Sequence, residues 1–185
     1  MTPFRVKAMM LALAICGLIS LLVGCSSVPK NILKEAPGEA EAIVLNIKAD
    51  SMLNQYNGEP HTLVLCVYQL SVPDVFKEMG KNDEGLSRLM SCNSFGDSVT
   101  AYQRAIVNPG EVTSIVVDRE KGTLFVGLVA GYYDPTPGKS TKLYKIPITV
   151  YREGFAGWKE MYRWPEKLRV SLMLNPKGIR EEKEE

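Results

Sequence analysis

The residues whose side chains could serve as nucleophiles, bases or metal ligands include four cysteines and a single histidine. A hydrolase that pairs a nucleophile with a base is hard to assemble, because His61 is the only imidazole and follows Pro60 at the start of an apolar segment. The sequence has no glycine-rich phosphate loop and no carboxylate pair or metal-ligand cluster at informative spacing. We therefore expect no enzymatic activity, no metal site and no cofactor.

Cys25 stands at the end of an N-terminal apolar segment. Arg5 and Lys7 give this segment a positive start, and residues 8–23 carry no charge. A membrane-spanning helix needs about 20 apolar residues, more than this run supplies, and the layout is typical of a secretory signal. The sequence Leu22-Val23-Gly24-Cys25 resembles the bacterial lipobox, in which the cysteine sulfur receives a diacylglyceryl group and the chain is cleaved before it. The alternative is an ordinary signal peptide in which Cys25 has no role.

The lipobox resemblance implies a location. Residues 1–24 are then the signal peptide and residues 25–40 a lipidated tether, since residues 26–39 are polar and contain two prolines. Ser26 follows the cysteine, the usual arrangement in lipoproteins of the outer membrane. Each buried methylene contributes about 0.8 kcal/mol, so several acyl chains form a lasting anchor. We expect the folded part at the periplasmic face of the outer membrane.

Cys66 and Cys92 remain once Cys16 leaves with the signal and Cys25 carries lipid. In an oxidising compartment the simplest fate of two such cysteines is a disulfide. The alternative is a pair of buried free thiols. A zinc site that adds His61 is not expected, because the spacing lacks a paired-ligand motif.

Charge and composition exclude several classes of partner. The chain has 22 basic and 21 acidic residues, a formal charge of +1, so it lacks the large basic surface of a nucleic-acid-binding protein. No small-molecule substrate is indicated either. The remaining class is a protein that works by binding, with one domain over residues 41–176 and a charged tail over residues 177–185.

The pattern of that domain predicts an all-β sandwich. Short segments rich in β-branched residues are separated by turns such as Asn108-Pro109-Gly110, and this spacing is typical of a sandwich. The predicted strands are Ala42–Ile47, Thr62–Leu70, Val99–Val107, Val112–Val117, Thr123–Tyr132, Leu143–Tyr151 and Lys167–Leu174.

One stretch departs from the strand pattern. Residues 73–92 carry apolar side chains at helical spacing, with an interruption near residues 80–85, and predict two short helices between the second and third strands. The second strand is apolar on both faces, so we expect one face in the core and the other under these helices. A bridge between Cys66 and Cys92 would fasten the insert to the sheet.

The long connection Ala49–His61 is the predicted binding surface. It carries Met52, Leu53 and Tyr56 among polar residues, a mixture favoured in docking surfaces. The alternative is that Leu53 packs into the edge of the domain and the loop is inert.

Trp158, Tyr162 and Trp164 suggest a rival function, stacking against sugars, because Trp158 and Tyr162 would share a face of a short helix.

Taken in order, these motifs resemble the TssJ family of type VI secretion lipoproteins. The resemblance rests on the lipobox, Asp50, Leu53-Asn54, Gly58, Pro60, Tyr68-Gln69-Leu70, Phe76, Asn108-Pro109-Gly110-Glu111, Val129-Ala130-Gly131-Tyr132-Tyr133, Ile146-Pro147 and the segment near Trp158. Cys66, Cys92 and the charged tail depart from the family pattern.

The resemblance implies a transthyretin-like sandwich of about seven to eight strands with a helical insert. It also implies a role as the outer-membrane anchor of the secretion membrane complex. The loop between the first two strands would bind the periplasmic C-terminal region of TssM, which in turn associates with TssL. In this chain the predicted contact residues are Asp50, Met52, Leu53, Asn54, Gln55 and Tyr56. The alternatives are a carbohydrate-binding module and a structural lipoprotein of another envelope assembly.

Overall fold

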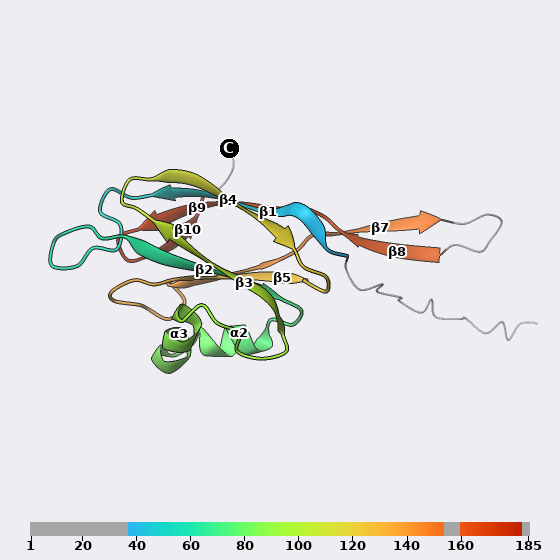
Figure 1. Ribbon diagram of the computed structural model, residues 1–185, viewed down its shortest axis with the longest axis horizontal. Coiled ribbons are helices and arrows are strands. Elements are labelled where there is room, and N and C mark those ends of the chain that lie inside the picture. Colours follow the sequence, from blue (N-terminus) through green and yellow to red (C-terminus); the bar gives the residue numbers. More distant parts are fainter. Residues whose placement is uncertain (1–36, 154–159, 183–185) are drawn as a thin grey trace, which may run out of the picture. The chain divides into compact units, whose positions relative to one another are not determined.

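The computed structural model describes residues 37–153 and 160–182, which fold as a β-sandwich (Figure 1). Two four-stranded sheets form the sandwich, and a two-stranded hairpin and two short helices complete the described part. The predicted all-β sandwich with a helical insert is confirmed. Cys25 and the signal segment lie outside the described residues. Within those residues, neither helix is long and apolar enough to cross a membrane.

The first sheet has the strand order β10-β9-β1-β4. Its central strand β1 pairs antiparallel with β4 and parallel with β9. Because side chains alternate along a strand, Ile43, Leu45 and Ile47 all point into the core. The strands of this sheet are β1 (Glu39–Ala49), β4 (Val112–Arg119), β9 (Leu168–Asn175) and β10 (Gly178–Glu181).

The second sheet is antiparallel, with the order β3-β2-β5-β6. Leu65 and Val67 of β2 face the first sheet, while Cys66 and Tyr68 face outward into a second apolar cluster. The prediction that this strand is covered on both faces is therefore confirmed. The strands are β2 (Leu63–Leu70), β3 (Val99–Val107), β5 (Phe125–Ala130) and β6 (Thr141–Lys145).

The helical insert covers the outer face of the second sheet (Figure 1). It consists of α2 (Asp74–Met79) and α3 (Asp83–Met90). Phe76 reaches the sheet because Gly127 has no side chain; a Cβ there would lie 2.6 Å from the Phe76 ring. The Tyr68 hydroxyl donates a hydrogen bond to the Leu89 carbonyl at 2.6 Å, and burial raises the pKa of Tyr68.

Cys66 and Cys92 form a disulfide between β2 and the end of α3, with their Cα atoms 5.4 Å apart. Cys92 has a φ of 51°, and both cysteines belong to the apolar cluster under the helices. The bridge fastens the insert to the sheet, as the sequence predicted.

Reducing this disulfide is expected to lower the free energy of unfolding by about 3 to 4 kcal/mol, since the bridge closes a loop of 26 residues. Urea titrations with and without dithiothreitol measure the difference. A Cys92→Ser variant is the matched control and should not respond to the reductant. Equal midpoints for the wild type in both conditions would contradict the prediction.

Strands β7 (Ile148–Glu153) and β8 (Glu160–Pro165) form a hairpin that the sequence did not predict. The predicted strand 143–151 is in fact two strands, β6 and β7, because Ile146 is buried in the core and Pro147 cannot donate to a ladder. The short helix that would put Tyr162 on one face with Trp158 is not formed at Tyr162, because β8 pairs antiparallel with β7. Ile148, Thr149 and Val150 supply β-branched residues for that pairing.

The prediction of a charged tail over residues 177–185 is wrong for residues 178–181. Residues 178–181 form β10, which pairs antiparallel with β9. Ile179 is buried in the core between more exposed neighbours, and this one apolar side chain gives the segment a strand pattern.

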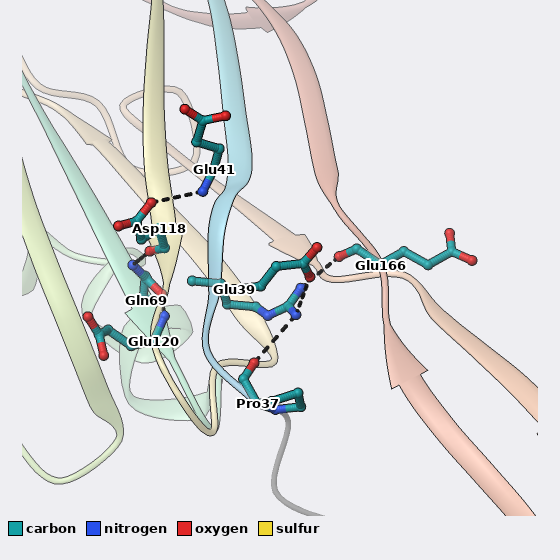
Figure 2. Close-up of polar contacts among 8 residues, drawn as sticks. Pro37, Glu39, Glu41, Gln69, Asp118, Glu120 and Glu166 are labelled. Carbon is teal, nitrogen blue, oxygen red and sulfur yellow. Dashed lines mark hydrogen bonds and ion pairs between the residues drawn. The ribbon is translucent and has the colours of Figure 1, made fainter.

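The buried Arg119 links several segments at the end of the sandwich where β1 begins. The Arg119 guanidinium contacts the Glu39 carboxylate at 2.7 Å and donates hydrogen bonds to the carbonyls of Glu166 at 2.9 Å and Pro37 at 3.4 Å (Figure 2). These contacts join β4 to the start of β1 and to the connection between β8 and β9. The loop between β1 and β2 begins at the other end of β1.

Candidate functional site

The β1–β2 loop is tied by its backbone to three neighbouring segments. The amide of Asp50 donates to Leu174 O at 2.9 Å, and its carbonyl accepts from Gly110 N at 3.0 Å. Further along, the Gln55 amide donates to Pro176 O at 3.2 Å. These bonds give the loop a defined shape, so side chains on it are presented in fixed positions.

Leu53 and Asn54 are buried residues that stabilise the loop. Leu53 is 0% exposed and belongs to the main core. Asn54 is 3% exposed, has a φ of 51°, and uses its side chain twice. Its Nδ2 donates to Thr62 O at 2.9 Å, and its Oδ1 accepts from the Tyr133 amide at 2.8 Å. Leu53 and Asn54, two of the predicted contact residues, are therefore buried, and Leu53 packs into the domain as the alternative stated.

The other predicted contact residues differ in their exposure. Asp50 shapes the start of the loop, because its Oδ1 accepts from the Met52 amide at 2.7 Å. Met52 and Gln55 are half-buried, and Tyr56 is exposed. Of the six residues, Tyr56 therefore offers the largest accessible side chain to a partner.

The tip of the loop is a tight turn. The backbone groups of Tyr56 and Glu59 exchange two hydrogen bonds of 3.0 Å, and the two residues between them, Asn57 and Gly58, have φ of 50° and 82°. Asn-Gly is the favoured pair for such a two-residue turn, because both positions need a positive φ. Asn57 and Gly58 at the tip are exposed, and Tyr56 begins the turn.

Three rings gather at the base of this tip, and we call Tyr56, His61 and Tyr133 the aromatic patch. The Tyr56 and Tyr133 rings stack with centroids 4.8 Å apart, and His61 meets Tyr133 edge to face at 4.9 Å. The His61 Nδ1 donates to Glu59 O at 3.0 Å, which orients the imidazole. Tyr56 is 50% exposed and Tyr133 57%. Such rings bind through apolar area with a polar edge.

Sequence reasoning missed two members of this patch. Tyr133 lies on the β5–β6 loop, far from the β1–β2 loop in the sequence, and reaches it through the Asn54 side chain. His61 ends the predicted binding loop, but the sequence alone indicates no role for its ring. The signal that could have found Tyr133 is its position beside Tyr132 just after a strand, where one ring can be buried and the next exposed.

The rival sugar-binding set is not brought together on a helix. Trp158 lies outside the described residues, and Trp164 is 52% exposed on β8. Tyr162 lies on the same strand, so the proposed helical face does not exist. Within residues 37–153 and 160–182, no group of three histidine, cysteine or acidic side chains could hold a metal ion.

Comparison with known proteins identifies relatives by family and by fold. A family model described as type VI secretion lipoprotein, with the names VasD, EvfM and TssJ, matches residues 41–175. No protein with a curated description matches the sequence.

Solved structures share the fold at low sequence identity. Lip from Serratia marcescens, a membrane-bound component of the type VI secretion system, matches with a TM-score of 0.58 and 16% identity, over 77% of this chain and 98% of Lip. The lipoprotein TssJ1 from Pseudomonas aeruginosa matches with a TM-score of 0.56 and 18% identity, over 81% and 99%. A chain in a structure described as the TssM C-terminal domain from EAEC has a TM-score of 0.53 and 16% identity, over 77% and 98%.

The family match covers nearly the whole sandwich, from β1 to the last residue of β9. It confirms the resemblance drawn from the ordered motifs and does not support the alternative of a lipoprotein from another envelope assembly. The chain belongs to the type VI secretion lipoprotein family that includes TssJ.

Proposed function

We propose that this chain is the outer-membrane lipoprotein of a type VI secretion membrane complex and that the aromatic patch docks the periplasmic C-terminal region of TssM. The observation that carries the proposal is the stacked Tyr56–Tyr133 pair, which is half exposed. Tyr56 lies on the β1–β2 loop, whose backbone is hydrogen-bonded to neighbouring segments, and the Tyr133 amide is bound by Asn54 of that loop. Family membership supports the same role.

The patch has the properties of a binding anchor. Tyrosine is enriched where interfaces gain most of their binding free energy. Because Asn54 and the neighbouring backbone bonds already fix the position of the rings, little conformational entropy is lost on docking. Partner binding of this kind needs no catalytic group, in keeping with a role as a passive anchor.

The two ends of β1 lead to the two attachment points that the proposed role requires. Its first residue, Glu39, leads back along the sequence to the tether and to Cys25, whose lipid would hold the chain at the periplasmic face of the outer membrane. Its last residue, Ala49, leads into the docking loop. Lipid tethering also raises the effective concentration of the loop at the assembly site, where TssM would link the chain indirectly to TssL.

Replacing Tyr56 and Tyr133 together with alanine is expected to weaken binding to the TssM C-terminal fragment by about 100-fold, because two adjacent aromatic anchors are lost. Isothermal titration calorimetry measures the affinity. Tyr102→Ala is the matched control, since Tyr102 is a similarly exposed tyrosine on β3, and it should leave the affinity unchanged. Wild-type affinity in the double variant would contradict the proposed site.

A further inference from the structure

A pocket lined by positive charge lies next to the docking loop. It has a volume of about 480 Å³ and is formed by the β5–β6 loop, β6 and the turn between β9 and β10. We call it the basic pocket. Its polar side chains are those of Lys139, Lys142, Asn175, Lys177 and Arg180, and no acidic residue lines it.

The cations of the basic pocket have no acidic partner among residues 37–153 and 160–182. In the described part of the chain, none of Lys139, Lys142, Lys177 and Arg180 forms an ion pair. Glu182, two residues after Arg180, pairs instead with Lys48, with 3.8 Å between Glu182 Oε1 and Lys48 Nζ. The chain as a whole is almost neutral, so four cationic side chains around one pocket are a local concentration of positive charge.

The charged side chains that line the basic pocket are ammonium and guanidinium groups, which only donate hydrogen bonds. Charge-assisted hydrogen bonds from such groups to a carboxylate are stronger than neutral ones, so the pocket is suited to a carboxylate.

Backbone hydrogen bonds connect the pocket to the docking loop. The Ile179 amide donates to Lys139 O at 2.9 Å, which joins β10 to the β5–β6 loop. Pro176, a lining residue, accepts the 3.2 Å hydrogen bond from Gln55 of the β1–β2 loop. The β5–β6 loop also carries Tyr133, so one loop contributes to both the pocket and the aromatic patch.

We propose that the basic pocket binds an acidic segment, rich in aspartate or glutamate, of the same protein partner that docks on the aromatic patch. This inference rests on the proposed function and adds the chemistry that the partner must present. Charge complementarity of this kind accelerates encounter and fixes the orientation of the partner.

The place of the pocket in the fold favours a protein over a lipid headgroup. β9 runs parallel to β1, and the pocket opens at its last residue, Asn175, at the Ala49 end of β1. The eleven residues of β1 span about 35 Å, so the pocket is that far from Glu39, where the sequence leads to the lipidated tether.

The test uses the full chain in detergent, the TssM C-terminal fragment and two double charge reversals. Lys177→Glu with Arg180→Glu changes the pocket. Lys167→Glu with Arg169→Glu is the matched control, because both residues are exposed near the start of β9, away from the pocket. We expect the pocket variant to bind about tenfold more weakly at low salt, with a shallower salt dependence, and the control to stay within about twofold of wild type.

The outcomes separate this inference from the proposed function. If the pocket variant binds like wild type while the Tyr56 and Tyr133 double variant does not, the acidic-segment proposal is overturned and the docking site stands. If the wild type itself does not bind the fragment, both fail. If the pocket variant keeps its affinity for the fragment but loses binding of glycerol phosphate, which has the headgroup chemistry of anionic lipids, the pocket is a lipid site and the proposal is overturned.

Discussion

Replacing Leu53 with aspartate is expected to unfold the domain rather than to weaken docking alone. Leu53 is 0% exposed and packs in the main core with residues of both sheets. Truncating such a leucine to alanine costs about 2 to 5 kcal/mol. A buried carboxylate adds a desolvation penalty. Because small domains are stable by only about 5 to 15 kcal/mol, the aspartate variant should lose its cooperative transition.

Thermal unfolding followed by circular dichroism measures this effect. Met52→Asp is the control, since Met52 precedes Leu53 in the same loop and is only half-buried. It should fold normally. If Leu53→Asp instead melts like wild type and loses only its affinity for the partner, Leu53 is a surface contact after all and the core assignment is wrong.

Replacing Glu39 with alanine should be the second most damaging change. The Arg119 side chain is 0% exposed and Glu39 Oε2 lies 2.7 Å from its Nη2, while the Glu39 side chain is 34% exposed. Without Glu39 a buried guanidinium is left without a counter-charge, and breaking a buried pair in this way costs about 3 to 5 kcal/mol. Urea-induced unfolding gives the change in free energy.

The two members of this pair are not equivalent, which sharpens the test. Arg119→Met should cost less than Glu39→Ala, because the partly exposed Glu39 carboxylate can be hydrated once the arginine is gone. Glu41→Ala, an exposed position two residues along, should cost little. A larger loss for Arg119→Met than for Glu39→Ala would show that the guanidinium acts mainly through its hydrogen bonds to Pro37 and Glu166.

Local pattern was enough to predict most of the sandwich. The doubly apolar second strand indicated a covered outer face, and α2 and α3 cover it. The helical spacing of residues 73–92 located those helices, and the two leftover cysteines indicated the bridge that joins them to the sheet. These features depend on residues close in sequence or on simple pairing.

Features that depend on distant partners could not be predicted. The Trp158–Tyr162 spacing fits a helix, but pairing with β7 makes residues 160–165 a strand. β10 is set by one buried isoleucine and by its pairing with β9, so its charged residues alone indicated a solvated tail. Binary pattern does not reveal which strand a short segment will pair with.

The proposed docking site also depends on residues that are distant in the sequence. Its loop was located from its length and composition, and Tyr56 was among the chosen residues. Leu53 and Asn54 were chosen because the family pattern marks them, yet the structure gives them an internal role that shapes the loop. Tyr133 completes the exposed surface from a different loop, and no spacing rule connects it to Tyr56.

Site-specific photo-cross-linking in cells tests the central claim most directly. A benzoylphenylalanine at position 133 keeps an aromatic ring in the patch, and the same residue at position 164 probes an equally exposed ring on the β7–β8 hairpin. We expect a covalent adduct with TssM from position 133 and none from position 164. An adduct from position 164 alone, with the secretion complex assembled, would contradict docking through the β1–β2 loop.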